Sequence, residues 1–208
     1  LIVDKGTRNI KNSEAYNLGL VELQDASSQA SVLQLSTDQN GPILDYCAGG
    51  GGKALALNAY LNKPIFAYDA NLFRMKDLPK RASRSGADIR IIQSNDLKNS
   101  YYGLVFCDAP CSGSGTWRRD PEGKWSITLR DYQKLLSLQD NILTTAAQLV
   151  QSNGRLVYTT CSVLKDENKT QIQKFLANSK EWVLEKEKLF MPNELGDGFY
   201  FATLKKNK

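Results

Sequence analysis

Residues 42–53 read PILDYCAGGGGK, in which a short apolar run leads into four consecutive glycines. The apolar run is typical of a buried strand, and residues 53–61, which follow the glycines, are typical of a helix. Glycines let the backbone turn tightly and approach a ligand closely, and the amino end of a helix favours negative charge. This order of strand, glycine turn and helix predicts the first unit of an α/β sheet that binds a ligand at the turn.

The alternation of short apolar strands and helices continues outward from this stretch. Further strands are predicted at residues 64–69, 89–93, 102–108 and 155–160, a late pair of strands at 182–186 and 199–204, helices at 23–35, 72–85, 128–150 and 165–177, and an irregular segment at 4–17. Asp25 is the expected cap of the first helix. Strands of this kind indicate a mostly parallel sheet with helices on both faces, so the expected fold class is α/β and Rossmann-like.

The glycine turn has the spacing of a dinucleotide-binding site. Gly49 to Ala54 fits the Gly-x-Gly-x-x-Ala pattern, and Asp69 ends the second predicted strand, where an acid that binds a ribose diol is expected. A phosphate-binding P-loop is excluded, because Cys47 stands where its first glycine belongs and Ala54 replaces its hydroxyl residue. The pattern fits both a nicotinamide cofactor and S-adenosylmethionine. The chain has no histidine and no Tyr-x-x-x-Lys pair, which disfavours hydride transfer.

Two cysteines follow two different predicted strands, in the sequences DAPC (108–111) and TTC (159–161). Methylation of cytosine at carbon 5 needs a thiolate that adds to carbon 6 and makes carbon 5 nucleophilic toward a methyl sulfonium. Such a thiol must be partly accessible and have a lowered pKa, and strand ends suit this, because ligands bind there in such sheets. Asp108 could bond the cytosine ring or the amino group of a methionine moiety, and Asp96, or its neighbour Asn95, an adenine amino group.

The composition narrows the class of protein. The chain has 208 residues, of which 41% are hydrophobic, enough for one domain with a buried core, and its net charge of +5 favours a phosphate-bearing partner. Four cysteines without a Cys-x-x-Cys pair or a histidine indicate neither a disulfide scaffold nor a metal site. The sequence shows no signal peptide and no apolar run of about 20 residues, so a cytoplasmic location without membrane contact is expected. The chain is also expected to be a monomer.

The segment at residues 112–125 mixes aromatic and basic side chains after the fourth predicted strand. Arg118, Arg119 and Lys124 stand beside two tryptophans, and such a mixture suits an unstacked base and its phosphates. These three residues are therefore candidates for RNA binding. The alternative is that Trp117 and Trp125 anchor the loop onto the core, since large aromatic side chains are usually buried.

Several motifs, taken in order, resemble the RNA 5-methylcytosine methyltransferases of the Sun/RsmB and NOP/NSUN type, whose bacterial members modify small-subunit ribosomal RNA. The similar segments are LQDASSQ (23–29), DAPCSGSG (108–115), RRDP (118–121), KW (124–125), YTTCSV (158–163), EN (167–168) and GDGFYF (196–201). The resemblance implies a Rossmann-like methyltransferase fold with S-adenosylmethionine as cofactor. It also implies methyl transfer to cytosine carbon 5 in RNA, with ribosomal RNA as the expected substrate, through a covalent cysteine–cytosine adduct.

The resemblance also implies roles for individual residues. Cys161 is the implied nucleophile, Cys111 the cysteine that assists release of the methylated base, and Asp108 a residue that also touches the cytosine. Cofactor contacts are implied for Cys47, Ala48, Gly49, Gly50, Gly51, Gly52, Lys53, Asp69, Asp96 and Asp108. Residues 1–22 are expected to be a lead-in and 23–208 the catalytic domain, with the family's upstream RNA-binding domain absent from this chain.

The chain departs from the family pattern at Gly49 and Gly50, where the family usually has Ala-Pro. The glycines are expected to make the loop more mobile and to weaken cofactor affinity, because glycine loses more entropy on ordering. Two alternatives to an RNA methyltransferase stay open. One is a DNA cytosine methyltransferase, in which Cys111 attacks, and the other is a catalytically inactive RNA-binding or ribosome-assembly module.

Overall fold

The computed structural model describes residues 7–97 and 101–207, so residues 1–6 of the predicted lead-in lie outside the described part. The strands are β1 (Ile43–Asp45), β2 (Ile65–Ala67), β3 (Ile89–Ile91), β4 (Tyr102–Asp108), β5 (Val150–Thr160), β6 (Trp182–Phe190) and β7 (Phe199–Lys206). The α-helices are α1 (Glu14–Asn17), α2 (Ala26–Val32), α3 (Gly52–Leu61), α4 (Leu78–Ser85), α5 (Ser94–Leu97), α6 (Gly123–Ser126), α7 (Leu129–Gln148) and α8 (Lys169–Asn178). Four 3-10 turns are η1 (Thr7–Asn12), η2 (Leu72–Met75), η3 (Ser114–Thr116) and η4 (Lys165–Glu167).

The strands form one seven-stranded sheet in the order β3-β2-β1-β4-β5-β7-β6. The five strands from β3 to β5 are parallel, and β7 runs antiparallel to both β5 and β6. The expected α/β fold is confirmed, and the late pair of strands is a hairpin. Strand order reverses between β1 and β4, and a crevice at such a point is where α/β sheets bind ligands.

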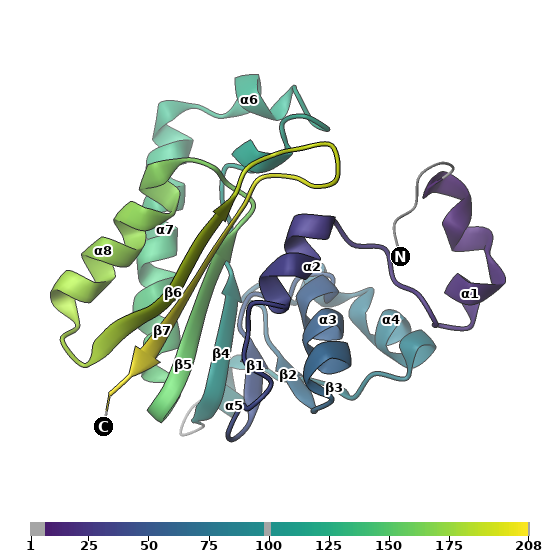
Figure 1. The fold of residues 1–208 in the computed structure, drawn as a ribbon, viewed down its shortest axis with the longest axis horizontal. Helices are drawn as coiled ribbons and strands as arrows, with labels where there is room; N and C mark the ends of the chain where they lie inside the picture. Colours follow the sequence, from purple (N-terminus) through teal and green to yellow (C-terminus); the bar gives the residue numbers. More distant parts are fainter. Residues whose placement is uncertain (1–6, 98–100, 208) are drawn as a thin grey trace.

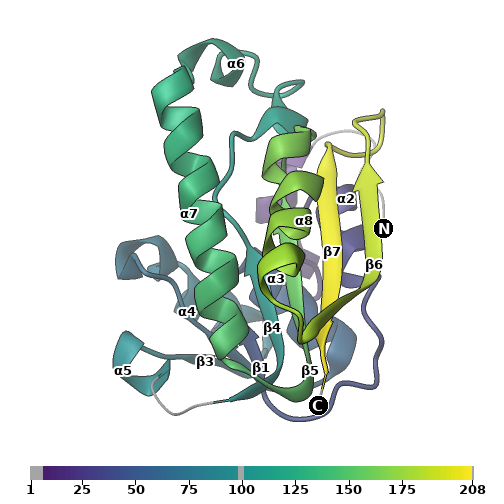
Figure 2. The same ribbon diagram turned by 90° about the vertical axis from the view of Figure 1, so that its left-hand side faces the viewer.

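Helices cover both faces of the sheet, with α7 and α8 on one face and α2, α3 and α4 on the other (Figures 1 and 2). Alternate side chains of β4 supply both cores. Val105 and Cys107 pack with α7 and α8, whereas Leu104 and Phe106 pack with α2, α3 and α4. All four are fully buried, so Cys107 is a core residue. In the described part of the chain, no helix combines the length and hydropathy needed to cross a bilayer.

The helices differ from the sequence-based prediction for local reasons. The predicted helix at 72–85 is divided into η2 and α4, because Pro79 lacks an amide hydrogen and fits only the first turn of a helix. The predicted helix at 165–177 is divided into η4 and α8 at Asn168, whose backbone is not helical. The segment predicted to be irregular contains η1 and α1, and Ser13 caps α1 by accepting the Tyr16 amide. Asp25 caps α2, as predicted.

Candidate active site

The glycine turn between β1 and α3 folds onto the acid that ends the second strand. The Gly49 amide donates to Asp69 Oδ2 at 3.0 Å, and the Asn71 amide donates to Oδ1 at 2.9 Å. Arg74 Nη1 lies 3.3 Å from Asp69 Oδ2, and the Arg74 side chain is half exposed. Gly51 has φ +83°, and a Cβ there would lie 2.1 Å from a Leu78 methyl carbon, so only glycine fits this position.

Two cavities meet at this turn, because Cys47 and Arg74 line both of them. The larger has a volume of about 470 Å³, and its walls include Tyr46, Tyr68 and Asp69. The smaller has a volume of about 320 Å³. One part of its wall is the glycine turn, with Ala48, Gly49, Gly50 and Gly52, and the other part is polar, with Gln24, Ser28, Lys53, Arg81 and Asp108. A pocket lined by two tyrosines and an acid, next to a polar pocket, has the shape and chemistry to hold an adenosine joined to an amino acid.

Asp45, the last residue of β1, is a buried acid that the sequence analysis did not select. Its side chain is fully buried, and neither carboxyl oxygen has a well-formed hydrogen bond among the described residues, although the backbone N–H of Cys47 lies near enough to lower the Asp45 pKa slightly. Burial raises the Asp45 pKa to about 8, with a further contribution from the charge of Asp108, while Lys53 partly offsets both. A buried carboxyl without a well-formed hydrogen bond is costly, and such groups mark functional sites. Its place directly before the glycine turn is the signal that could have identified it.

Replacing Asp45 with asparagine is expected to change how stability depends on pH. Folded Asp45 keeps its proton up to about pH 8, whereas in the unfolded chain it ionises near about pH 4. Folding therefore takes up a proton between these values, so the wild type loses up to about 1.4 kcal/mol of stability per pH unit as the pH rises through this window. Urea unfolding of both proteins at about pH 5 and about pH 7 measures this, because the asparagine variant lacks that slope. Asp88→Asn, which removes an exposed acid, is the control. A difference that stays constant with pH would contradict the raised pKa.

Lys53 joins the glycine turn to the end of β4. Its Nζ donates to Asp108 Oδ2 at 2.8 Å and to Ser28 Oγ at 2.7 Å, and it lies 4.6 Å from the centre of the Phe199 ring. The Lys53 side chain is only 7% exposed. Thr159 Oγ1 donates to Asp108 Oδ1 at 3.0 Å, so both carboxylate oxygens are held in place. This pair brings a fixed positive charge close to the end of β5.

The two cysteines after β4 and β5 meet in space. Cys111 Sγ and Cys161 Sγ lie 3.3 Å apart, and both side chains are half-buried free thiols. The hydrogen bond shared with Cys111 lowers the pKa of Cys161, while burial and the charge of Asp108 oppose this shift and the charge of Lys53 adds to it. The same hydrogen bond, together with burial, raises the pKa of Cys111. The two sulfurs therefore differ in the direction of their pKa shifts, with ionisation favoured at Cys161 over Cys111.

The predicted RNA-binding arginines are attached to an acid from another part of the chain. Arg119 Nε donates to both carboxylate oxygens of Asp197, at 3.1 and 2.8 Å, and Arg118 Nη2 lies 3.4 Å from Oδ1. About half of each arginine side chain stays exposed. Lys124 Nζ lies 5.1 Å from the Trp125 ring centre, and that tryptophan is 81% exposed. An exposed Trp125 does not anchor the loop, which contradicts the anchoring alternative for this residue.

Asp96 lies in α5, at the end of the sheet that carries the other site residues. It is exposed, and its Oδ2 accepts the Gln93 amide at 2.7 Å. Neither Asp96 nor its neighbour Asn95 lines the two cavities beside the glycine turn. Contact of either residue with an adenine therefore stays a prediction.

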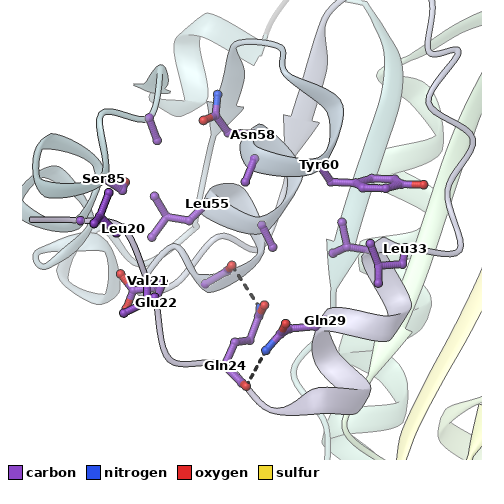
Figure 3. Close-up of a pocket in the computed structure, with 16 residues that line it drawn as sticks. Leu20, Val21, Glu22, Gln24, Gln29, Leu33, Leu55, Asn58, Tyr60 and Ser85 are labelled. Atoms are coloured by element: carbon purple, nitrogen blue, oxygen red, sulfur yellow. Dashed lines mark hydrogen bonds between the residues drawn. The ribbon is translucent and has the colours of Figure 1, made fainter. Parts of the chain in front are cut away.

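A further cavity of about 420 Å³ lies beside α3 and borders the smaller site cavity at Gln24 and Gly52 (Figure 3). Its walls come from residues 19–24, α2 and α3, and Gln24 Nε2 donates to the Gly52 carbonyl at 3.1 Å. Leu33, Leu55 and Tyr60 make the rest of the wall largely apolar (Figure 3). Among the described residues, no thiol lines this cavity, so it lacks the chemistry that the cysteine pair provides.

Comparisons with known proteins agree with this geometry. A family model described as 16S rRNA methyltransferase RsmB/F matches residues 30–205. Ribosomal RNA small subunit methyltransferase B of Pasteurella multocida (strain Pm70) is 33% identical over 215 residues, which cover 92% of this chain and 48% of the relative. The protein of the same name from Escherichia coli O6:K15:H31 (strain 536 / UPEC) is 34% identical over 204 residues, covering 91% and 48%. The chain therefore spans about half the length of these relatives.

Solved structures share the fold. The structure of PH0851 superposes with a TM-score of 0.89 at 29% identity and covers 97% of this chain and 51% of its own. NSun6 from Pyrococcus horikoshii, solved with SFG, superposes with a TM-score of 0.82 at 24% identity, covering 96% and 56%, which supports the fold alone. The family model accounts for most of the chain, and the resemblance noted in the sequence motifs is confirmed. This chain belongs to the 16S rRNA methyltransferase RsmB/F family.

Proposed function

We propose that this chain transfers a methyl group from S-adenosylmethionine to carbon 5 of a cytosine in small-subunit ribosomal RNA. The observation that carries the proposal is the thiol pair, in which the two sulfurs lie 3.3 Å apart within hydrogen-bond distance and the pKa of Cys161 is lowered by its contact with Cys111. A paired thiol of this kind suits covalent attack on a pyrimidine. Membership of the family supports the RNA substrate, because its curated relatives are named for small-subunit ribosomal RNA.

The residues around the two cavities fit S-adenosylmethionine. Asp69 offers a carboxylate to the ribose diol, and the aromatic walls of the larger cavity suit an adenine ring. Arg74 and Arg81 line the smaller cavity and supply positive charge for the carboxylate of the methionine moiety. When bound, the cofactor supplies an electrophilic methyl group.

The chain's own groups then act on the cytosine. The Cys161 thiolate forms a bond to carbon 6, and the electron pair of the ring double bond makes carbon 5 nucleophilic toward the methyl group. Removal of the carbon 5 proton by a base re-forms the double bond and expels the Cys161 thiolate. We assign this base to Cys111, which must first lose its own proton to solvent before it takes the proton from carbon 5. Asp108 is held by Lys53 and Thr159 as an acceptor for a ring-edge N–H. A raised pKa for Cys111 argues against the alternative in which that residue attacks.

We further propose that residues 23–208 form the catalytic domain and that Arg118, Arg119 and Lys124 contact the RNA. The exposed Trp125 beside Lys124 offers a stacking surface for a base. The two arginines share Asp197 in this structure, and their exposed halves leave room for a phosphate contact. The preceding segment joins the domain through Glu22, which pairs with two arginines of α4.

Replacing Asp69 with asparagine is expected to weaken S-adenosylmethionine binding by about tenfold or more, because charge-assisted hydrogen bonds to the ribose diol are lost. Calorimetry with the cofactor measures this, and Asp88→Asn is the matched control, since Asp88 is an exposed acid at the opposite end of the sheet. Methyl transfer from tritium-labelled cofactor to small-subunit ribosomal RNA, followed by bisulfite sequencing, tests the reaction. Cofactor binding without transfer to any RNA would instead support an inactive RNA-binding module.

A further inference from the structure

Glu167 is a fully buried acid at the end of η4, and the proposed reaction does not yet use it. Its Oε1 accepts the Ser112 amide at 2.8 Å and Gln139 Nε2 at 3.0 Å. Its Oε2 accepts the hydroxyl groups of Ser112 and Ser162. All four partners donate, which is the pattern that an ionised carboxylate accepts. A buried carboxylate is kept only where such partners offset its desolvation, so this network is a built feature of the fold.

The partners of Glu167 lie on the two loops that carry the thiols. Ser112 follows Cys111 in the chain, and Ser162 follows Cys161, whereas the two cysteines are 50 residues apart in sequence. A single carboxylate therefore fastens both loops to one point. Further hydrogen bonds join the same loops, including Ser114 Oγ to Ser162 Oγ at 2.8 Å, but these act between the loops and involve no charged group.

We propose that Glu167 is a positioning residue for the thiol pair, holding the Cys111 loop and the Cys161 loop so that the thiol of Cys111 points at the sulfur of Cys161. The inference deepens the proposed function, because that function depends on ionisation of Cys161 in preference to Cys111. The negative charge of Glu167 also disfavours ionisation of Cys111. It adds to the hydrogen bond and burial that raise the pKa of Cys111, and so favours ionisation at Cys161.

The test measures the thiols directly and needs neither RNA nor cofactor, so its outcome is independent of whether the chain methylates RNA. Dibromobimane joins two neighbouring thiols by displacing two bromides, and peptide mass spectrometry locates the bridge. In Glu167→Gln we expect bridging of Cys111 to Cys161 to slow by about tenfold, the effect of one lost charge-assisted hydrogen bond. We also expect the pH midpoints for iodoacetamide alkylation of the two cysteines to move closer together, a change that a purely structural role would not produce.

The matched control is Asp166→Asn, which removes an exposed acid from the same turn and should leave both readouts unchanged. If Glu167→Gln does not fold, Ser112→Ala and Ser162→Ala each remove one hydroxyl donor and should each slow bridging to a smaller extent. A folded Glu167→Gln with the bridging rate and the alkylation midpoints of the wild type overturns the proposal. If that variant is unfolded, wild-type values in both serine variants overturn it.

Discussion

Replacing Cys161 with alanine is expected to abolish the covalent RNA adduct and to lower methyl transfer by about a thousandfold or more, the scale seen when a covalent nucleophile is removed. The physical reason is the division of roles within the thiol pair. Cys161 shares a hydrogen bond with Cys111 and is the thiol whose pKa is lowered. In Cys161→Ala, burial and the charge of Glu167 still raise the pKa of Cys111, so Cys111 is not expected to replace the lost nucleophile.

The adduct can be measured with RNA that carries 5-fluorocytosine, because its carbon 5 has no proton to lose and the thiolate stays bound. Denaturing gels then separate the adduct from free RNA. Cys107→Ala is the matched control, since it removes a thiol that is fully buried in the core on the α7 side of the sheet. An adduct formed by Cys161→Ala would show that the roles of the two cysteines are reversed.

Replacing Cys111 with alanine is expected to have the opposite effect on the adduct, which should accumulate with ordinary cytosine RNA and cofactor. Attack by Cys161 is retained, whereas the release assigned to Cys111 is lost, so a single turnover leaves the RNA attached. The variant also loses the hydrogen bond that lowers the pKa of Cys161. The pKa of Cys161 should therefore rise toward its ordinary value, and adduct formation should need a higher pH than in the wild type.

The yield of protein–RNA adduct over time, measured at several pH values on denaturing gels, checks both effects. The double variant Cys111→Ala/Cys161→Ala is the control, because loss of the adduct in that variant places the bond on Cys161. Rapid turnover without accumulation in Cys111→Ala would mean that another group releases the product.

Much of the fold could be predicted from local sequence. Apolar runs identified all seven strands, and Asp25 identified the start of α2, because these signals depend on near neighbours in the chain. Pro79 marks the break between η2 and α4 by an equally local effect. The predicted helices at 72–85 and 165–177 were each expected to be continuous, because the apolar spacing runs on through both. The structure divides each into a 3-10 turn and an α-helix.

The sequence identifies most of the site residues as separate motifs, but it does not show which of these residues contact one another. The cysteines, Asp69, Lys53 and Asp108 all follow strands or begin a helix, and parallel strands bring such ends to one edge. The contact of Arg119 with Asp197 could not be predicted, because these residues lie 78 positions apart and the contact depends on the β6–β7 hairpin returning to the loop after β4. In the sequence, Asp45 looks like an ordinary residue at the end of a strand. Its complete burial and raised pKa depend on how the surrounding elements pack.

The sequence by itself determined the family, the α/β alternation, the glycine turn and the presence of two thiols after two strands. Only the folded structure brings the two thiols together and shifts their pKa values in opposite directions, which supports Cys161 as the nucleophile. A pKa depends on burial, charge and hydrogen bonds contributed by distant segments, here by Cys111, Lys53 and Asp108 at the ends of neighbouring elements. The same holds for Glu167, whose role depends on two loops meeting at one carboxylate. Local patterns fix what each segment becomes, whereas the chemistry of a site depends on which segments meet.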